Sequence, residues 1–396
     1  MADFLDRASP PHILTLVIAT SVSALATNVF LPSLPGIARH FEADYALAQL
    51  TVSIYLAATA VLQLGIGPAS DRFGRRPVML VCLGIFTLGS LAAILAPTIE
   101  LLLAARILQA FSAAGMVLAR AIVRDTVASD QAASRIGYIT MGMAMVPMVA
   151  PMIGGLLDEI YDWRASFVMM IVFGLIAFLL VFLDLGETNR NASASLAAQM
   201  RAYPGLIRSL PFWGYALTGA FCMAMFFVLV GAGPFVATEL LGLRPSEYGL
   251  YFGMLSLGYM IGNFLSGRYS RQVGLDTMML NGNVMAVVGT ALAFGLFWFG
   301  LGNALALFGP MVIVGIGNGM TLPNAAAGVV SVRPELAGSA SGLAGSLQLG
   351  FAALVSAFAG IVVTVETGVL ALLALMLVAG FAAILVSLPL AYRKSG

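Results

Sequence analysis

Charged residues are scarce in this chain. Asp, Glu, Lys and Arg make up 9% of its 396 residues, whereas hydrophobic residues make up 60% and the mean hydropathy is +0.99. An apolar content this high exceeds what one water-soluble core can bury, so the composition excludes an ordinary soluble domain. We therefore expect a protein that crosses the lipid bilayer several times.

Cysteine, histidine and lysine are also rare, and each absence excludes a class of protein. The two cysteines, Cys82 and Cys222, lie inside apolar runs, so a disulfide framework is not expected. One lysine stands against eighteen arginines at a net charge of +1, which provides no basic field for nucleic acid. The only histidines, His12 and His40, belong to no metal-ligand or nucleophile–base pattern. We expect no metal, no cofactor and no enzymatic activity, and without an output domain a receptor is disfavoured.

Long apolar runs dominate the chain, and each is long enough to span a bilayer at roughly 20 residues per crossing. Strands of a barrel would alternate in shorter segments, whereas helices satisfy their own backbone groups in lipid. The sequence therefore predicts an all-α membrane protein with twelve transmembrane helices. The runs are 11–32, 46–68, 77–97, 101–123, 136–157, 165–184, 211–233, 247–267, 276–299, 302–324, 338–363 and 368–391.

The distribution of basic residues predicts the orientation. Most loop arginines and the single lysine fall on the side of the membrane that holds the N-terminus, and only Arg39, Arg164 and Arg244 fall on the opposite side. The positive-inside rule then places both termini in the cytoplasm, and an even number of helices agrees. Asp3, Asp6 and Arg7 precede a first run long enough to span, so we expect no removable signal peptide.

The two halves of the chain repeat each other. S-D-R-F-G-R from Ser70 resembles S-G-R-Y-S-R from Ser266, and G-M-V-L-A-R-A from Gly115 resembles G-M-T-L-P-N-A from Gly319, at offsets of about 200 residues. A duplicated six-helix unit explains both offsets. We predict bundles at 1–185 and 211–396, joined by a polar linker at 186–210 that forms a cytoplasmic segment, partly an amphipathic surface helix. Parallel repeats of this kind place a substrate site between the halves.

Charges concentrate in one short segment, G-P-A-S-D-R-F-G-R-R-P, between two apolar runs. Gly67 and Gly74 would allow close approach and a tight turn, and the charged residues could pair across a cytoplasmic seam. The alternative is that the arginines only obey the positive-inside rule, which does not explain the acid. The charged residues are Asp71, Arg72, Arg75 and Arg76.

One predicted span carries charged and polar side chains that lipid disfavours. Arg106 lies inside a predicted span, where a guanidinium normally faces a polar cavity or a partner, and Gln109 shares its helix face. Arg120, fourteen residues after Arg106, returns to nearly the same azimuth and is expected either in the cavity or at the cytoplasmic interface. The next predicted span is rich in glycine and proline. Glycine leaves one helix face without side chains and proline interrupts the backbone hydrogen bonds, which predicts tight packing and a bend. Its residues are Gly142, Pro147, Pro151, Gly154 and Gly155.

These motifs together resemble the major facilitator superfamily, and within it the bicyclomycin- and chloramphenicol-resistance group of drug:proton antiporters. The resemblance covers nearly the whole chain, and the order of its short motifs is more specific than any one of them. The motifs are L-P-S-L-P-G-I-A from Leu31, the loop above, R-I-L-Q-A-F from Arg106, R-A-I-V-R-D from Arg120, A-P-M-I-G-G from Ala150, G-A-G-P-F-V from Gly231 and A-G-S-A-S-G-L-A-G from Ala337.

The resemblance assigns roles to these residues. It implies that Asp71 meets the start of the eleventh helix and that Arg75 meets Asp125, forming a cytoplasmic gate that breaks apart when that side opens. It implies that Arg106 couples proton and substrate binding, and that the helix with Pro147, Pro151, Gly154 and Gly155 seals against proton leak. Generic packing with a kink is the alternative for that helix.

One residue departs from the family pattern. Asn28 stands where the family usually has the acid that carries the proton, and no Asp or Glu lies near the middle of any predicted span. An amide can hydrogen-bond a substrate but cannot titrate. Three interpretations remain open: a natural variant with another carrier, a facilitator without proton coupling, or a carboxylate deliberately neutralised to hold one state.

The function expected from these patterns is drug efflux across the bacterial inner membrane by proton-coupled alternating access, with the proton as coupling ion. The alternative is a proton-independent facilitator or importer of a small metabolite. We expect a monomer that takes small amphipathic or apolar compounds, since flexible thioethers and flat rings suit varied ligands. Lipid-facing or interhelical packing competes with this role for most such side chains. The predicted cavity residues are Asn28, Tyr55, Arg106, Gln109, Met145 and Phe221.

Overall fold

The structure is a computed structural model that describes residues 5–7, 9–127, 129–189, 205–333 and 336–392. All regular elements in these residues are helices, which confirms the all-α prediction. The first part of the chain contains α1 (Ile13–Asn28), η1 (Leu31–Ser33), α2 (Leu34–His40), α3 (Tyr45–Phe73), α4 (Arg75–Ile94), α5 (Ile99–Gln109), η2 (Ala110–Ser112), α6 (Ala113–Thr126), α7 (Ser129–Ile160) and α8 (Arg164–Asp184). The second part contains α10 (Leu210–Phe235), η3 (Val236–Leu240), α11 (Pro245–Val273), α12 (Leu275–Trp298), α13 (Ala304–Val332), α14 (Ala337–Val362) and α15 (Gly368–Tyr392).

Eleven helical segments in the described residues are long and apolar enough to cross a membrane. The twelfth predicted span corresponds to α11, which has 29 residues but falls outside this set. Its sequence is less apolar because Glu247, Arg268 and Arg271 lie near its ends and glycine and serine recur within it. We count α11 as the twelfth span because it packs between α7 and α13.

Two of the spans are interrupted. The first runs from Ile13 to His40 and is broken at η1, where Pro32 lacks the N–H that a continuous helix would use. The fourth runs from Ile99 to Thr126 and tightens into a 3-10 turn at Ala110–Ser112. Both breaks lie next to the arginine inside the fourth span, where irregular backbone can offer its carbonyl groups as acceptors.

The predicted loop at 67–77 is shorter than expected. Helix α3 continues through Pro68 to Phe73, and only Gly74 separates it from α4. Gly74 has φ +97°, which favours glycine, so its predicted turn is confirmed. Gly67 instead lies inside α3, and a side chain there would make only ordinary contact with Val117, so the predicted close approach at Gly67 is wrong.

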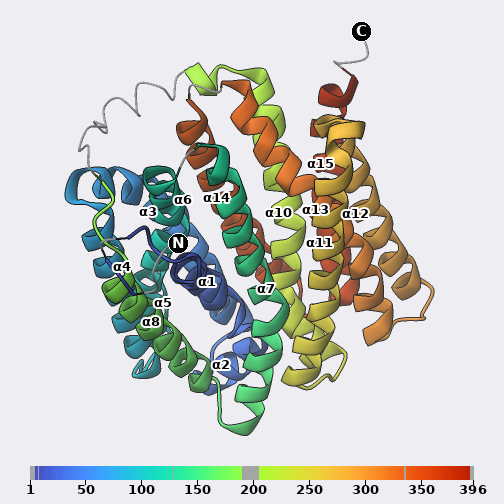
Figure 1. The fold of residues 1–396 in the computed structure, drawn as a ribbon. Helices are drawn as coiled ribbons and strands as arrows, with labels where there is room; N and C mark the ends of the chain where they lie inside the picture. The colour runs from blue at the N-terminus through green and yellow to red at the C-terminus, as the bar shows by residue number, and fades with distance from the viewer. Residues whose placement is uncertain (1–4, 8, 128, 190–204, 334–335, 393–396) are drawn as a thin grey trace.

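Figure 1 shows the arrangement of the helices. The blue-to-green helices of the first part lie mainly on the left and the yellow-to-red helices of the second part mainly on the right, with α7 and α14 between them. Helix α7 packs on α11 and α3 packs on α14, so these two pairs join the parts. Bundles at 1–185 and 211–396 remain a prediction. Most of the predicted linker and its surface helix, at 190–204, lies outside the described residues.

Glycine allows several helices to touch backbone to backbone. A side chain at Gly115 of α6 would overlap the carbonyl of Ala19 in α1. Gly258 and Gly262 of α11 lie in the same way against Val312 and Ile316 of α13. Because lipid tails are as apolar as leucine, such close packing is what holds helices together inside a membrane.

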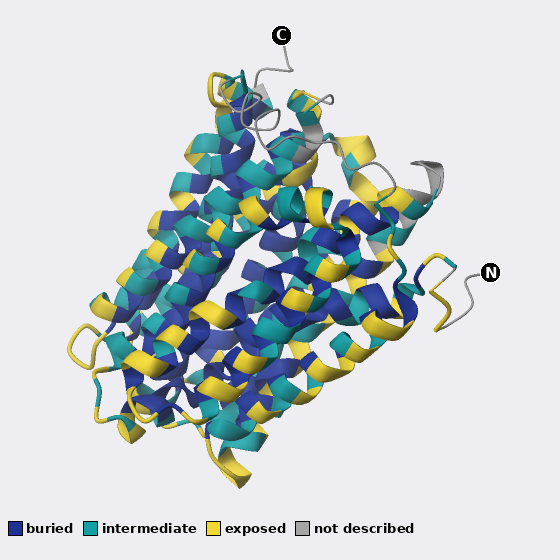
Figure 2. Ribbon diagram, turned by 90° about the vertical axis from the view of Figure 1, so that its left-hand side faces the viewer, coloured by how far each residue is buried: buried dark blue, intermediate teal, exposed yellow. Residues whose placement is uncertain are grey.

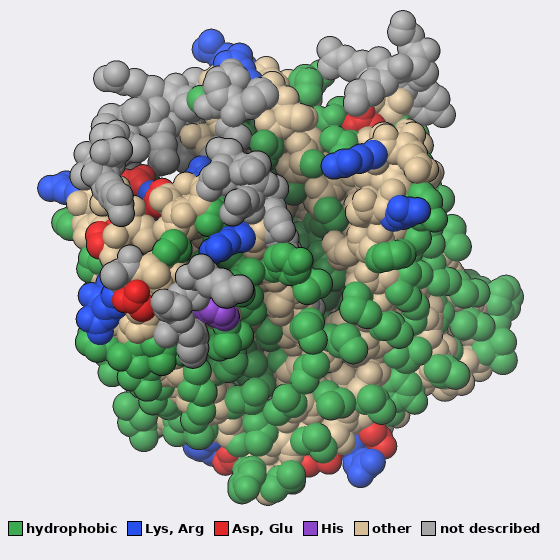
Figure 3. All heavy atoms as spheres, in the orientation of Figure 1, with side chains coloured by type: hydrophobic (Ala, Val, Ile, Leu, Met, Phe, Trp, Pro, Cys, Tyr) green, Lys and Arg blue, Asp and Glu red, His purple; other side chains and the backbone are tan. Residues whose placement is uncertain are grey.

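The surface agrees with a membrane setting. Buried residues fill the interior of the bundle and exposed residues lie on its periphery (Figure 2). Hydrophobic side chains cover most of the flank in Figure 3, while charged side chains gather toward the two ends. We call the end with the Gly74 turn, Arg268 and Arg271 the arginine-rich face. The end with Arg39, Glu159 and Glu239 is the opposite face.

The glycine contacts predict a stability difference between two matched variants. In Gly154→Ala the new methyl group would overlap the carbonyl of Val29, whereas in Gly84→Ala it would meet no atom within 4 Å. We expect Gly154→Ala to destabilise the folded protein by roughly 1–3 kcal/mol, since overpacking costs about that much, and Gly84→Ala to be neutral. Thermal unfolding in detergent measures both. Equal melting temperatures would contradict the packing described here.

Candidate functional site

Arg106 lies at the centre of a buried polar network. Its side chain is 0% exposed. Its Nε donates to the carbonyl of Thr51 at 2.9 Å, and its Nη2 donates to the carbonyl of Ala26 at 3.0 Å. Its Nη1 donates to Oε1 of Gln109 at 2.5 Å, in agreement with the predicted shared helix face. No ion pair with an acid involves Arg106 among the described residues.

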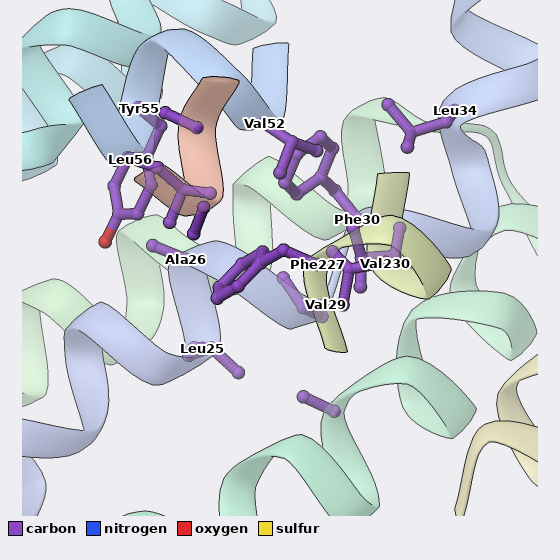
Figure 4. Close-up of a cluster of buried hydrophobic side chains, with 14 of the residues drawn as sticks. Leu25, Ala26, Val29, Phe30, Leu34, Val52, Tyr55, Leu56, Phe227 and Val230 are labelled. Carbon is purple, nitrogen blue, oxygen red and sulfur yellow. The ribbon is translucent and has the colours of Figure 1, made fainter. Parts of the chain in front are cut away.

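Two aromatic rings complete the surroundings of this guanidinium. Its Cζ lies 4.3 Å from the ring centroid of Phe30 and 4.4 Å from that of Tyr55, at distances that allow cation–π attraction. Figure 4 shows Phe30 and Tyr55 among the buried apolar side chains around the end of α1. The expectation that Arg106 points into a water-accessible cavity is therefore wrong for this structure, because rings and backbone enclose it.

Hydroxyl groups extend the network to two more helices. Gln109 donates from Nε2 to Ser90 of α4 at 2.9 Å. The hydroxyl of Tyr55 lies 2.9 Å from Oγ of Ser23 in α1 and 2.9 Å from Oγ of Ser112 in η2. Sequence reasoning missed these serines, although buried hydroxyls in apolar runs were a usable signal. The network binds α1, α3, α4 and α5 into one unit.

Asn28 lies at the end of α1, where the first span breaks. It is 4% exposed and its Nδ2 donates to the carbonyl of Ala24 at 2.8 Å. Its Oδ1 is buried without a hydrogen-bond partner among the described residues. An unpaired buried acceptor is costly, so this oxygen is available to a donor that enters the site.

The remaining predicted cavity residues, Met145 and Phe221, lie outside the Arg106 network. Met145 of α7 is 58% exposed and belongs to no polar network. Phe221 of α10 packs edge-on against Phe351 of α14, with ring centroids 5.2 Å apart. Arg120 does not continue the face of Arg106, because the η2 turn interrupts the helix between them; it lies instead beside Thr20 and Ile136.

The predicted gate residues gather around Arg75. Arg75 pairs through Nη1 with Asp71 at 2.5 Å and through Nε with Asp125 of α6 at 3.0 Å. Arg75 is 8% exposed, so these pairs are partly shielded from water. All three residues belong to the first part of the chain. The expected contact of Asp71 with the start of α14 stays a prediction, because residues 334–335 lie outside the described residues.

The remaining arginines of this segment behave differently. Arg76 donates to the carbonyl of Phe182 at the end of α8, at 3.1 Å. Arg72 lies exposed over the ring of its neighbour Phe73. Arg76 thus anchors α4 to α8, whereas Arg72 has only the surface position that the positive-inside rule explains.

Two residues after α8 complete the Gly74 turn and were not predicted. Oε1 of Glu187 accepts from the backbone N–H of Arg75 at 2.9 Å, so this carboxylate caps the first turn of α4. Asn189 donates to the carbonyl of Asp71 at 2.7 Å, at the end of α3. The start of the predicted linker is thereby joined to the Arg75 cluster, a link that depends on tertiary contact and leaves no local sequence signal.

The proline and glycine residues of α7 form a seam with α11. A side chain at Gly155 would overlap the carbonyl of Pro245, and one at Gly249 would overlap that of Pro151. Further along, Ser256 donates to the carbonyl of Pro147 at 3.3 Å. The tight packing predicted for this helix is confirmed.

The seam ends partway along the helices. Met141 and Met145 continue the α11-facing stripe of α7, and Met260 and Phe264 continue the α7-facing stripe of α11. These four side chains are 53–71% exposed, whereas the stripes are in contact nearer the opposite face. Helices α7 and α11 therefore separate toward the arginine-rich face.

Polar contacts close the opposite face between the two parts. Arg39 pairs with Glu239 at 2.7 Å, and Glu159 accepts from Oγ of Ser246 at 2.6 Å. Deeper in, Gln49 of α3 donates to Ser356 of α14 at 2.6 Å. Figure 4 shows Phe227 and Val230 of α10 lying beside Phe30 in the same region. The structure is thus sealed at the opposite face.

Among the described residues, no group of three or more His, Cys, Asp or Glu is placed to hold a metal. Cys82 and Cys222 are free and buried. The site is therefore built from hydrogen-bonding and apolar groups, with one buried guanidinium as its fixed charge.

Comparison with known proteins places this geometry in a family. The chain matches the Major Facilitator Superfamily over residues 16–353. It is 33% identical to an uncharacterized MFS-type transporter, YdgK, of Bacillus subtilis, over 85% of each chain. It is 30% identical to Multidrug resistance protein D of Escherichia coli, over 97% of this chain and 96% of that protein.

Further matches support the family and the fold. A Bicyclomycin resistance protein homolog of Haemophilus influenzae is 30% identical over 86% of this chain and 87% of that protein. A crystal structure of a bacterial homologue of the human lysosomal transporter Spinster, inward-facing and occupied, superposes with a TM-score of 0.75 at 18% identity over 96% of each chain. These relatives confirm the resemblance drawn from the motifs. The chain belongs to the Major Facilitator Superfamily and is a transporter rather than an enzyme.

Proposed function

We propose that this protein exports amphipathic or apolar drug-like compounds across the bacterial inner membrane. The observation that carries the proposal is similarity over nearly the whole chain to Multidrug resistance protein D, supported by the bicyclomycin-resistance homologue. Export proceeds by alternating access, in which bundles 1–185 and 211–396 rock about a site between them. The protein works as a monomer with both termini in the cytoplasm.

The contacts of the structure suggest how the rocking is divided. The Arg106 network ties α1, α3, α4 and α5 together, so these helices move as a unit. Helices α7 and α11 are in contact at one end only, so we expect the distance between them to change during transport. In the opposite state the Arg39–Glu239 pair would part and the stripe with Met145 and Met260 would close.

Proton-coupled antiport is the mode we propose, with the carrier elsewhere than Asn28. A proton-independent facilitator is the second candidate, and Asn28 favours it because an amide does not titrate. The two differ in energy source. Export by the antiporter stops when an uncoupler removes the proton gradient, whereas a facilitator continues to equilibrate its substrate.

Arg106→Lys tests the proposed site. An ammonium keeps the charge but cannot reach Thr51, Ala26 and Gln109 together with a planar fork, so we expect export to fall at least about tenfold. The control is Arg268→Lys on the exposed end of α11. Chloramphenicol and ethidium accumulation in cells expressing each variant gives the result. If wild type lowers the accumulation of neither compound, drug export is wrong; if Arg106→Lys exports normally, the site is wrong.

The internal repeat supplies a matched test of the gate. Arg75→Ala leaves Asp71 and Asp125 without their shared cation, and we expect roughly tenfold weaker export because breaking a shielded pair strands its charges. Arg271→Ala changes the corresponding residue of the second half, which is exposed and forms no ion pair among the described residues. Export measured in the same cells should be normal for Arg271→Ala. Equal activity of both variants would refute a gating role for Arg75.

A further inference from the structure

Away from their ends, the described membrane-spanning helices carry fixed charge of one sign. In the described residues, every Asp and Glu lies in a loop or within a few residues of a helix end. Arg106 and Arg120, by contrast, lie inside the span Ile99–Thr126. The interior therefore holds fixed positive charge without a fixed negative charge to balance it.

The charge of Arg106 is stabilised without being neutralised. Its partners are two backbone carbonyls, one amide oxygen and two aromatic rings, all of them uncharged groups. Dipoles and rings can solvate a guanidinium, but they leave its net charge in place. In surroundings of low dielectric constant the field of that charge reaches further than it would in water.

Arg120 adds a second positive charge nearer the arginine-rich face. It lies in a small cavity between α1, α6 and α7, beside Thr20, Met116 and Thr140, and is exposed. It forms no ion pair among the described residues; the other charged residues of its helix are Arg124, one turn on, and Asp125, which pairs with Arg75. The carboxylates of Asp71 and Asp125, at the same end of the spans, are both paired with Arg75, so they do not balance the charge of Arg120.

The end of α1 contributes an uncharged amide. Asn28 is 4% exposed, and its buried Oδ1 has no partner among the described residues. A carboxylate here would have offset the charge of Arg106 and attracted a cation. An amide instead offers an acceptor to a neutral hydroxyl or N–H donor, with no net charge.

We propose, on the basis of the proposed drug export, that the site selects substrates by charge and takes neutral or anionic amphipathic compounds while excluding lipophilic cations. The positive interior repels a cation and attracts an anion. A neutral compound with a hydrogen-bond donor avoids the repulsion and can satisfy Asn28. The substrate class thus follows from two arginines and one amide.

A pair of probes with the same shape and opposite charge tests this selectivity. Tetraphenylborate and tetraphenylphosphonium differ mainly in sign, so their binding to the purified full-length protein, measured by calorimetry in detergent, isolates the effect of charge. We expect tetraphenylborate to bind at least tenfold more tightly. Arg120→Gln should reduce this ratio, and Asn28→Asp should reduce it further by admitting the cation. Arg268→Gln, which removes an exposed arginine at the end of α11, should leave it unchanged.

The outcomes separate the two proposals. If tetraphenylphosphonium binds as tightly as tetraphenylborate, or if Arg268→Gln changes the ratio as much as Arg120→Gln does, selection by charge is overturned. If the ratio behaves as expected but cells expressing the protein accumulate chloramphenicol and ethidium normally, charge selection stands and drug export falls. Export of ethidium, which is a cation, with no export of chloramphenicol would support drug export and overturn the charge selection.

Discussion

A positive charge enclosed in the apolar interior constrains the rest of this protein. Arg106 cannot lose its partners without leaving a bare guanidinium in a medium that solvates it poorly, a loss that costs several kcal/mol. Its donors reach the backbone at Ala26 and Thr51 and the side chain of Gln109. The break at η1 and the turn at η2 lie beside it. Arg106 therefore ties α5 to α1 and α3, and Gln109 adds α4 through Ser90.

Because the Arg106 network holds its helices together, we expect motion at the contacts between the two parts of the chain. The pairs α7–α11 and α3–α14 join the two parts of the chain, and in the first pair the facing side chains are exposed toward the arginine-rich face. Glycine and proline make α7 suited to this role, since backbone contact at Gly155 is close while the stripe near Met145 lies open. The exposed Arg39–Glu239 pair adds little energy, about 1 kcal/mol or less, so the opposite face can open without a large barrier from that contact.

Sequence patterns predicted the elements whose cause is local. Apolar runs predicted the helices, and the glycine at position 74 predicted the turn. The three-residue spacing of Arg106 and Gln109 predicted that they share a helix face. Prediction failed where tertiary packing decides. Phe30 and Tyr55 enclose Arg106 through contacts between helices far apart in sequence.

Other misses have the same origin. Glu187 caps α4 from the end of another helix, which no window of sequence reveals. The turn at η2 rotates Arg120 away from the face of Arg106, although ideal helical spacing placed them together. The apolar run predicted to end at residue 68 continues as helix α3 to Phe73, with Pro68 inside it. Each of these features depends on neighbours that the local pattern does not contain.

The most direct test of the account measures both faces of the protein at once. Spin labels at Tyr138 and Phe264 report the arginine-rich face, and labels at Tyr161 and Val365 report the opposite face; all four positions are exposed. In a chain with Cys82 and Cys222 replaced, pulsed electron paramagnetic resonance measures the distance within each pair of labels before and after chloramphenicol is added. We predict that the first distance shortens while the second lengthens. Distances that stay fixed, or that change in the same direction, would contradict rocking of two bundles about the Arg106 unit.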